Sequence, residues 1–173
     1  MRARSVTLIL LLTAVAEQAS AQVDSTSKVD GWLIGMSVGV PGYRSSPEPA
    51  LFTIGANFTE VHPGRLGPDF SLGTMPRLFG EGVAVVGVRG GVVLPFALAP
   101  HLLLLPSVGT SFVFAAASSG GGGAFAGING GVATVLYDGS LGLRTGITWH
   151  RFQGVSEPIW LFEVGLVTIP TLR

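Results

Sequence analysis

The chain has 173 residues, enough for one domain, and its 10 Lys and Arg balance its 10 Asp and Glu. This balance argues against a nucleic-acid partner, and the absence of cysteine excludes disulfides and thiolate metal sites. Only 12% of the residues are charged, whereas soluble domains average about a quarter. The 26 glycines disfavour helices throughout.

The N-terminus has the pattern of a secretory signal peptide. Two arginines within the first four residues precede an apolar run at 6–16, and Ala19-Ser20-Ala21 is an A-x-A cleavage site. We predict a signal peptide over residues 1–21 and a periplasmic tail over residues 22–31. The alternative, an N-terminal membrane anchor, is disfavoured because the apolar run is too short to span a bilayer.

The rest of the chain alternates between apolar and small or polar residues with a period of two, which is typical of strands with two different faces. Between these stretches, Asp138-Gly139 is a strong hairpin signal. Eight strands are expected, at Trp32–Val40, Leu51–Thr59, Asp69–Met75, Val83–Leu94, Leu102–Phe114, Phe125–Tyr137, Leu141–Arg151 and Trp160–Thr168.

The two faces of these strands indicate what surrounds them. One face is too aromatic for water, and the other is too poor in charge to be a water-exposed surface, as in membrane barrels. We predict an all-β fold, a single antiparallel up-and-down transmembrane β-barrel of about eight strands over residues 32–173. A transmembrane helix from Leu102 is rejected because Pro106 and Gly109 interrupt it. A secreted soluble barrel that binds a small apolar ligand is the alternative, but it needs a charged outer face.

Aromatic residues are expected at the strand ends, where membrane barrels carry a girdle at each interface. Trp149, Trp160 and Phe162 are assigned to one girdle, and Trp32 to the other.

Three charged residues are expected to point into the lumen: Arg89, Arg144 and Glu163. Buried charges are costly unless they are paired, so we predict one self-neutralising cluster that plugs the lumen. An ion-binding or gating site is the alternative. The three histidines have no metal-ligand spacing, so no metal or cofactor is predicted.

On this alternation over Trp32 to Ile169, the chain resembles the small eight-stranded outer-membrane barrels, the OmpA/OmpX-like barrel domains. The resemblance implies a monomer in bacterial outer-membrane lipid, with a structural or surface-interaction role and no enzymatic activity. It also implies the barrel-assembly machinery as a partner. Glu163, Gly165 and Leu166 match the start of the C-terminal assembly signal of such proteins, whereas Thr168 and Pro170 replace its aromatics.

A lipid-modifying enzyme is the second interpretation. His150 resembles the catalytic histidine of the lipid A deacylases of the PagL type, and Glu163 lies on the next strand, where that resemblance implies an acidic partner. The serine of those enzymes, two residues after the histidine, is replaced here by Phe152. This replacement argues against ester hydrolysis.

Overall fold

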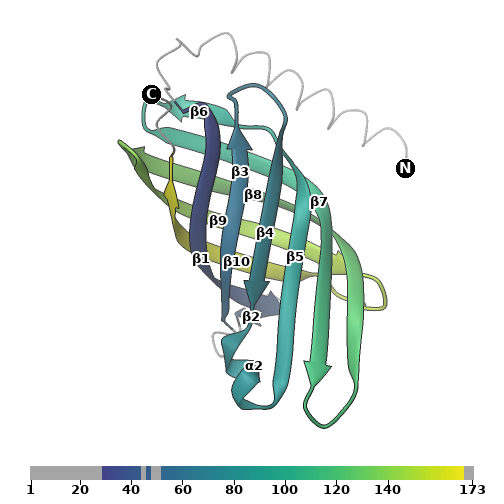
Figure 1. The fold of residues 1–173 in the computed structure, drawn as a ribbon. Helices are drawn as coiled ribbons and strands as arrows, with labels where there is room; N and C mark the ends of the chain where they lie inside the picture. The colour runs from purple at the N-terminus through teal and green to yellow at the C-terminus, as the bar shows by residue number, and fades with distance from the viewer. Residues whose placement is uncertain (1–28, 44–45, 48–51, 170–173) are drawn as a thin grey trace, which may run out of the picture.

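The computed structural model describes residues 29–43, 46–47 and 52–169 (Figure 1). Its only helix among these residues is α2 (Pro76–Gly80). The strands are β1 (Gly31–Tyr43), β2 (Ser46–Pro47), β3 (Thr53–Val61), β4 (Gly67–Thr74), β5 (Val83–Val93), β6 (Phe96–Ala99), β7 (Leu102–Ala117), β8 (Gly122–Asp138), β9 (Leu141–Phe152) and β10 (Ile159–Thr168).

Eight of these strands form a closed antiparallel barrel, as predicted. Each strand pairs with the next barrel strand along the chain, in the order β10-β9-β8-β7-β5-β4-β3-β1. The barrel closes where β1 pairs with β10, from Ile34 opposite Thr168 to Tyr43 opposite Ile159. The short strands β2 and β6 extend the sheet beside β1 and β7.

The predicted hairpin at Asp138-Gly139 is confirmed. Asp138 pairs with Leu141, and Gly139 has a φ of 57°, a left-handed conformation that glycine adopts without strain. The expectation of no helix is wrong at one place, because Pro76 begins the short helix α2 between β4 and β5. No helix among the described residues is both long enough and apolar enough to cross a membrane.

The alternation of faces is also confirmed. On β1, the side chain of Met36 is 66% exposed and that of Ser37 is 5% exposed, so neighbouring residues lie on opposite faces of the wall. Large apolar side chains cover the outside of the barrel on all eight of its strands. They include Ile34, Val38, Ile54, Phe58, Phe70, Leu72, Val88, Val92, Val108, Phe112, Val132, Leu136, Leu143, Val164 and Leu166.

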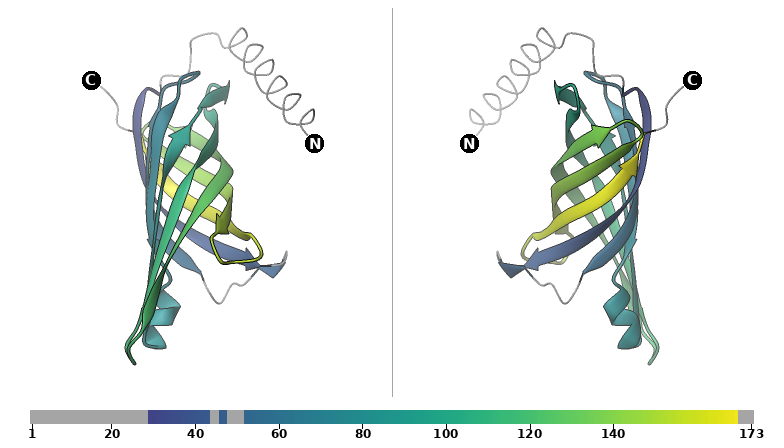
Figure 2. Two further views of the ribbon diagram at one scale, coloured as in Figure 1. Left: turned by 90° about the vertical axis from the view of Figure 1, so that its right-hand side faces the viewer. Right: turned by 90° about the vertical axis from the view of Figure 1, so that its left-hand side faces the viewer.

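The barrel has two different ends (Figure 2). We call the end where β1 begins and β10 stops the terminal end, and the end that carries α2 the loop end. Buried apolar side chains fill the lumen at the terminal end: Val29, Leu33, Val61, Val93, Leu103, Leu105, Ala133, Val135, Tyr137, Val167 and Ile169. Val29 belongs to the segment expected to be a tail, whereas the expected signal peptide lies outside the described residues.

His62 ties two segments together at the terminal end. Its Nδ1 contacts the carboxylate of Asp30, and its Nε2 lies 3.2 Å from Oε1 of Glu60. The hydrogen bond to Asp30 and, after it, the one to Glu60 raise the pKa of His62 above its ordinary value of 6.5.

A raised pKa means that the protonated ring favours the folded state. The stabilisation is therefore complete below about pH 6.5 and disappears as the pH rises through the pKa of the folded state. We expect the urea midpoint of unfolding to fall as the pH rises over that range. This dependence of the midpoint on pH, its slope, should be lost in His62→Gln. The control His101→Gln removes a histidine from the same end and should keep the slope. A wild-type midpoint that does not change over the range would contradict the assignment.

Candidate functional site

A belt of buried and half-buried polar side chains crosses the lumen beyond the apolar core of the terminal end. These side chains come from every barrel strand, because each strand directs alternate residues inward. The polar belt consists of Ser37, Asn57, Thr59, Asp69, Arg89, Ser111, Asn129, Arg144, Thr148, His150 and Glu163.

Arg89 on β5 is the central charge of the belt. Its side chain is 5% exposed, its Nη1 donates to Oγ1 of Thr148 at 2.8 Å, and the same nitrogen lies 3.5 Å from Oε2 of Glu163. Its Nη2 lies 3.8 Å from Oδ2 of Asp69. The guanidinium therefore bridges two carboxylates from different sides of the barrel.

The second arginine of the predicted cluster joins the belt through a hydroxyl. Nη1 of Arg144 donates to Oγ1 of Thr59 at 3.1 Å, and that hydroxyl donates to Oδ1 of Asp69 at 2.6 Å. Within the described part of the chain, Arg144 has no ion pair with Glu163. The structure thus joins Arg89 and Glu163 directly, and it links Arg144 to Asp69 through Thr59.

The predicted set of lumen charges missed Asp69, a second buried acidic residue beside Glu163. The predicted third strand begins at Asp69, whereas β4 begins at Gly67 and directs Asp69 into the lumen, where it is 3% exposed. The two-residue period could have found it, because Phe70 and Leu72 point outward and Asp69 lies out of phase with them. Two arginines and two acids therefore balance.

Glu163 is held from a second side by neutral groups. Oγ of Ser37 donates to Oε1 of Glu163 at 3.3 Å, and Nδ2 of Asn57 donates to Oγ of Ser37 at 2.9 Å. Oδ1 of Asn57 is buried and has no hydrogen-bond donor among the described residues.

A second group in the belt contains His150, where the sequence suggested an enzyme. Nδ2 of Asn129 donates to Oγ of Ser111 at 2.9 Å, and the Ser111 hydroxyl shares a hydrogen bond of 3.0 Å with Nδ1 of His150. The histidine ring stacks on Phe152 with centroids 5.9 Å apart. Sequence reasoning missed Ser111, which the alternation along β7 could have placed inward.

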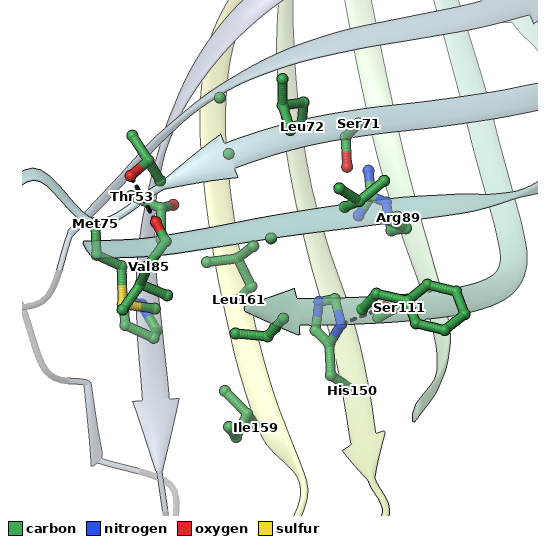
Figure 3. Close-up of a pocket in the computed structure, with 18 of the residues that line it drawn as sticks. Thr53, Ser71, Leu72, Met75, Val85, Arg89, Ser111, His150, Ile159 and Leu161 are labelled. Carbon is green, nitrogen blue, oxygen red and sulfur yellow. Dashed lines mark hydrogen bonds between the residues drawn. The ribbon is translucent and has the colours of Figure 1, made fainter. Parts of the chain in front are cut away.

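The lumen is hollow between the belt and the loop end, so the predicted packing does not extend to this part of the barrel. The cavity has a volume of about 300 Å³, and it has a polar side formed by the belt and an apolar side toward the loop end. Gly73 and Gly87, which pair across β4 and β5, face it without side chains. Figure 3 shows Ser71, Arg89, Ser111 and His150 on its polar side, together with apolar residues such as Met75 and Leu161.

The four residues assigned to the aromatic girdles lie toward the strand ends. Trp160 pairs with Trp149 between β10 and β9, and Phe162 is exposed two residues farther along β10. Trp32 is exposed at the start of β1, at the terminal end. Their interfacial role stays a prediction. Among the described residues, no group of three or more His, Asp or Glu could hold a metal ion.

Comparisons with known proteins give the class of this fold. No protein-family model and no curated protein matches the sequence. Solved structures match it over most of its length. The attachment invasion locus protein Ail of Yersinia pestis has a TM-score of 0.57 at 8% identity, covering 80% of this chain and 98% of that one.

Two further structures agree with that match. The N-terminal β-barrel domain of Pseudomonas aeruginosa OprF has a TM-score of 0.59 at 12% identity, covering 81% of this chain and 98% of the domain. Neisserial surface protein A has a TM-score of 0.57 at 9% identity, covering 82% of this chain and 99% of that one. The chain therefore has the fold of the small eight-stranded outer-membrane barrels, which confirms the resemblance in architecture.

Proposed function

We propose that this protein is a monomeric, non-enzymatic β-barrel of the bacterial outer membrane, closed to the passage of ions, with a structural or surface-interaction role. The observation that carries the proposal is the contrast between its two surfaces. Exposed apolar side chains cover the outer wall, while a balanced set of buried charges and a fully buried apolar core occupy the lumen.

The outer wall supports the location in lipid. A closed barrel satisfies every backbone hydrogen bond between its own strands, which hydrocarbon requires. Apolar side chains such as Met36, Val88, Val108 and Leu166 then face the acyl chains. A soluble barrel would need charged residues in their place.

The lumen supports the absence of a pore. Leu33, Leu103 and Leu105 are at most 2% exposed at the terminal end, so they leave little room for water. Beyond them, Arg89 spans the lumen between Asp69 and Glu163. An eight-stranded barrel is only about wide enough for its side chains to fill.

The loop end supports the surface role. β7 and β8 continue there beyond the end of β9, which stops at Phe152 opposite Gly127, while β5 stays paired with β7 as far as Ala117 (Figure 1). Pairing of Ala116 with Gly122 on one side and with Ala84 on the other orders this extension of the wall. A projecting hairpin provides a contact surface outside the membrane.

A lipid-modifying enzyme is the second candidate, favoured by the 3.0 Å contact between Oγ of Ser111 and Nδ1 of His150. A serine next to a histidine can act as a nucleophile with its base. However, Glu163 contacts Ser37 and Arg89 rather than His150, so the predicted acidic partner does not orient the ring.

Fractionation of the cell envelope and planar-bilayer recording test the proposal. We expect the protein in the outer-membrane fraction, no steady conductance from the purified barrel, and the same lipid A acyl chains in cells with wild-type protein and His150→Phe. Recovery in the soluble periplasm would favour the secreted barrel. Steady conductance would indicate a channel, and a change in acyl chains that depends on His150 would indicate the enzyme.

A further inference from the structure

The cavity at the loop end has a polar floor and mainly apolar walls. Its floor is a row of cross-strand partners, Asn57, Ser71, Arg89 and Ser111, which pair in that order across β3, β4, β5 and β7. Because direct partners on adjacent strands point to the same face, all four side chains point into the lumen as one row. His150 extends this row through its contact with Ser111.

The walls above this floor are mainly apolar. Met75, Val85, Val113, Ile159, Leu161 and Phe152 line them, and Thr53, Thr74 and Glu163 are the further polar lining residues. The volume of about 300 Å³ lies at the lower end of the range of about 300–1,000 Å³ for small-molecule sites. Such a space fits one slender hydrocarbon chain rather than a branched or ring-rich ligand.

The floor holds more hydrogen-bond donors than the protein satisfies. Nε and Nη2 of Arg89 are buried without a hydrogen-bond acceptor among the described residues, although Nη2 faces Asp69 at 3.8 Å. Nε2 of His150 is also buried without a partner. In the neutral tautomer in which Nδ1 accepts from Ser111, Nε2 carries the ring proton and is a donor. Unsatisfied buried donors are costly, so an oxygen acceptor placed there is favoured.

From these two features we infer that the cavity binds a single-chain fatty acid, with its carboxyl group on the floor at Arg89 and His150 and its chain along the apolar walls. The carboxyl oxygens accept from the arginine and the histidine. The inference concerns the lumen and adds a ligand to the proposed barrel without depending on its role at the surface.

The balance of charge in the belt favours a carboxyl group over a phosphate as the polar group of the ligand. Arg89 already faces Glu163 at 3.5 Å and Asp69 at 3.8 Å, so the belt has no excess positive charge for a dianion. A carboxyl group adds one negative charge or none. The free oxygen of Asn57, Oδ1, can accept from the protonated acid.

The two facing glycines give a way to fill the cavity. A Cβ built on Gly87 would have as its nearest neighbour Cγ2 of Val113, at 3.9 Å, so a side chain fits there and enters the space. Gly130 is the matched control, because its Cβ would meet only a backbone oxygen at 3.9 Å and its position does not line the cavity.

The test is a titration of carboxyl-labelled ¹³C-dodecanoic acid into the full mature barrel, refolded in phospholipid nanodiscs and observed by NMR. We expect one saturable bound resonance in the wild type and in Gly130→Leu, and its loss in Gly87→Leu. Folding of each variant is checked by heat-dependent gel mobility, and Gly73→Leu replaces Gly87→Leu if that variant does not fold. Equal saturable binding in the filled variant, or no saturable binding in the wild type, overturns the inference.

Competition tests the position of the carboxyl group. Dodecane lacks an acceptor and should displace the acid only at a concentration about tenfold higher than unlabelled dodecanoic acid, while His150→Phe should weaken acid binding about tenfold. A lysophospholipid with the same chain should compete poorly, because its headgroup cannot reach the floor. Equal competition by dodecane or by the lysophospholipid contradicts the orientation.

Discussion

Replacing Arg89 with methionine should lower the free energy of unfolding by about 3–5 kcal/mol, the usual cost of removing one partner from a buried ion pair. The side chain is 5% exposed and faces both Asp69 and Glu163. Without it, two carboxylates lie in a poorly hydrated lumen with Arg144 as their only remaining counter-charge in the belt. The measurement is urea unfolding of the barrel from lipid vesicles.

A double-mutant cycle separates this pair from a general loss of packing. Because Nη1 of Arg89 lies 3.5 Å from Oε2 of Glu163, Arg89→Met combined with Glu163→Gln should cost less than the sum of the single changes. Arg151→Met is the matched control, since Arg151 is exposed on β9 and should change stability little. Strict additivity would show that the two residues do not interact.

Replacing Val88 with arginine should destabilise the barrel in lipid by about 2–4 kcal/mol, provided that the outer wall faces hydrocarbon. Val88 is the middle residue of β5, is exposed on the outer wall, and lies between Leu72 and Phe112 on the neighbouring strands. A charge at this depth has no water to solvate it. Unfolding from phospholipid vesicles measures the change.

The same substitution near the end of β7 provides the control. Ala116 is exposed on the part of β7 that continues toward the hairpin turn, so Ala116→Arg should cost only about 0–1 kcal/mol. Thr148→Ser, which keeps the hydroxyl that accepts from Arg89, should also cost little. Similar losses for Val88→Arg and Ala116→Arg would contradict a membrane-facing wall.

The architecture was predictable because a period of two is a property of the sequence itself. Alternation assigned Met36 outward and Ser37 inward on β1, and Asp138-Gly139 fixed the turn between β8 and β9. Strand ends were harder to predict, because the alternation and the residue types do not change at the point where a strand ends. β7 therefore runs to Ala117, beyond the predicted end at Phe114.

The site was predictable only in part, because it depends on register across strands distant in sequence. Alternation can place Asp69 and Ser111 inward, but it cannot show that Ser111 lies opposite Arg89 or that Ser111 reaches His150. Those contacts depend on the stagger between strands, which turn lengths and the helix α2 help to set. The cavity could not be predicted, because it lies where Gly73 on β4 pairs with Gly87 on β5. The sequence of either strand alone does not reveal this pairing.

The seam between β1 and β10 imposes an order on biogenesis. Residues 34 to 43 of β1 find their backbone partners on that side only in residues 159 to 168, at the other end of the described chain. Until the last strand is present, β1 presents an open edge whose amides cannot be satisfied in hydrocarbon. Closure of the wall must therefore wait until β10 is present, and a contact of such long range makes folding slow. The exported polypeptide consequently needs to be held unfolded and unaggregated in water until its final strand can close the wall.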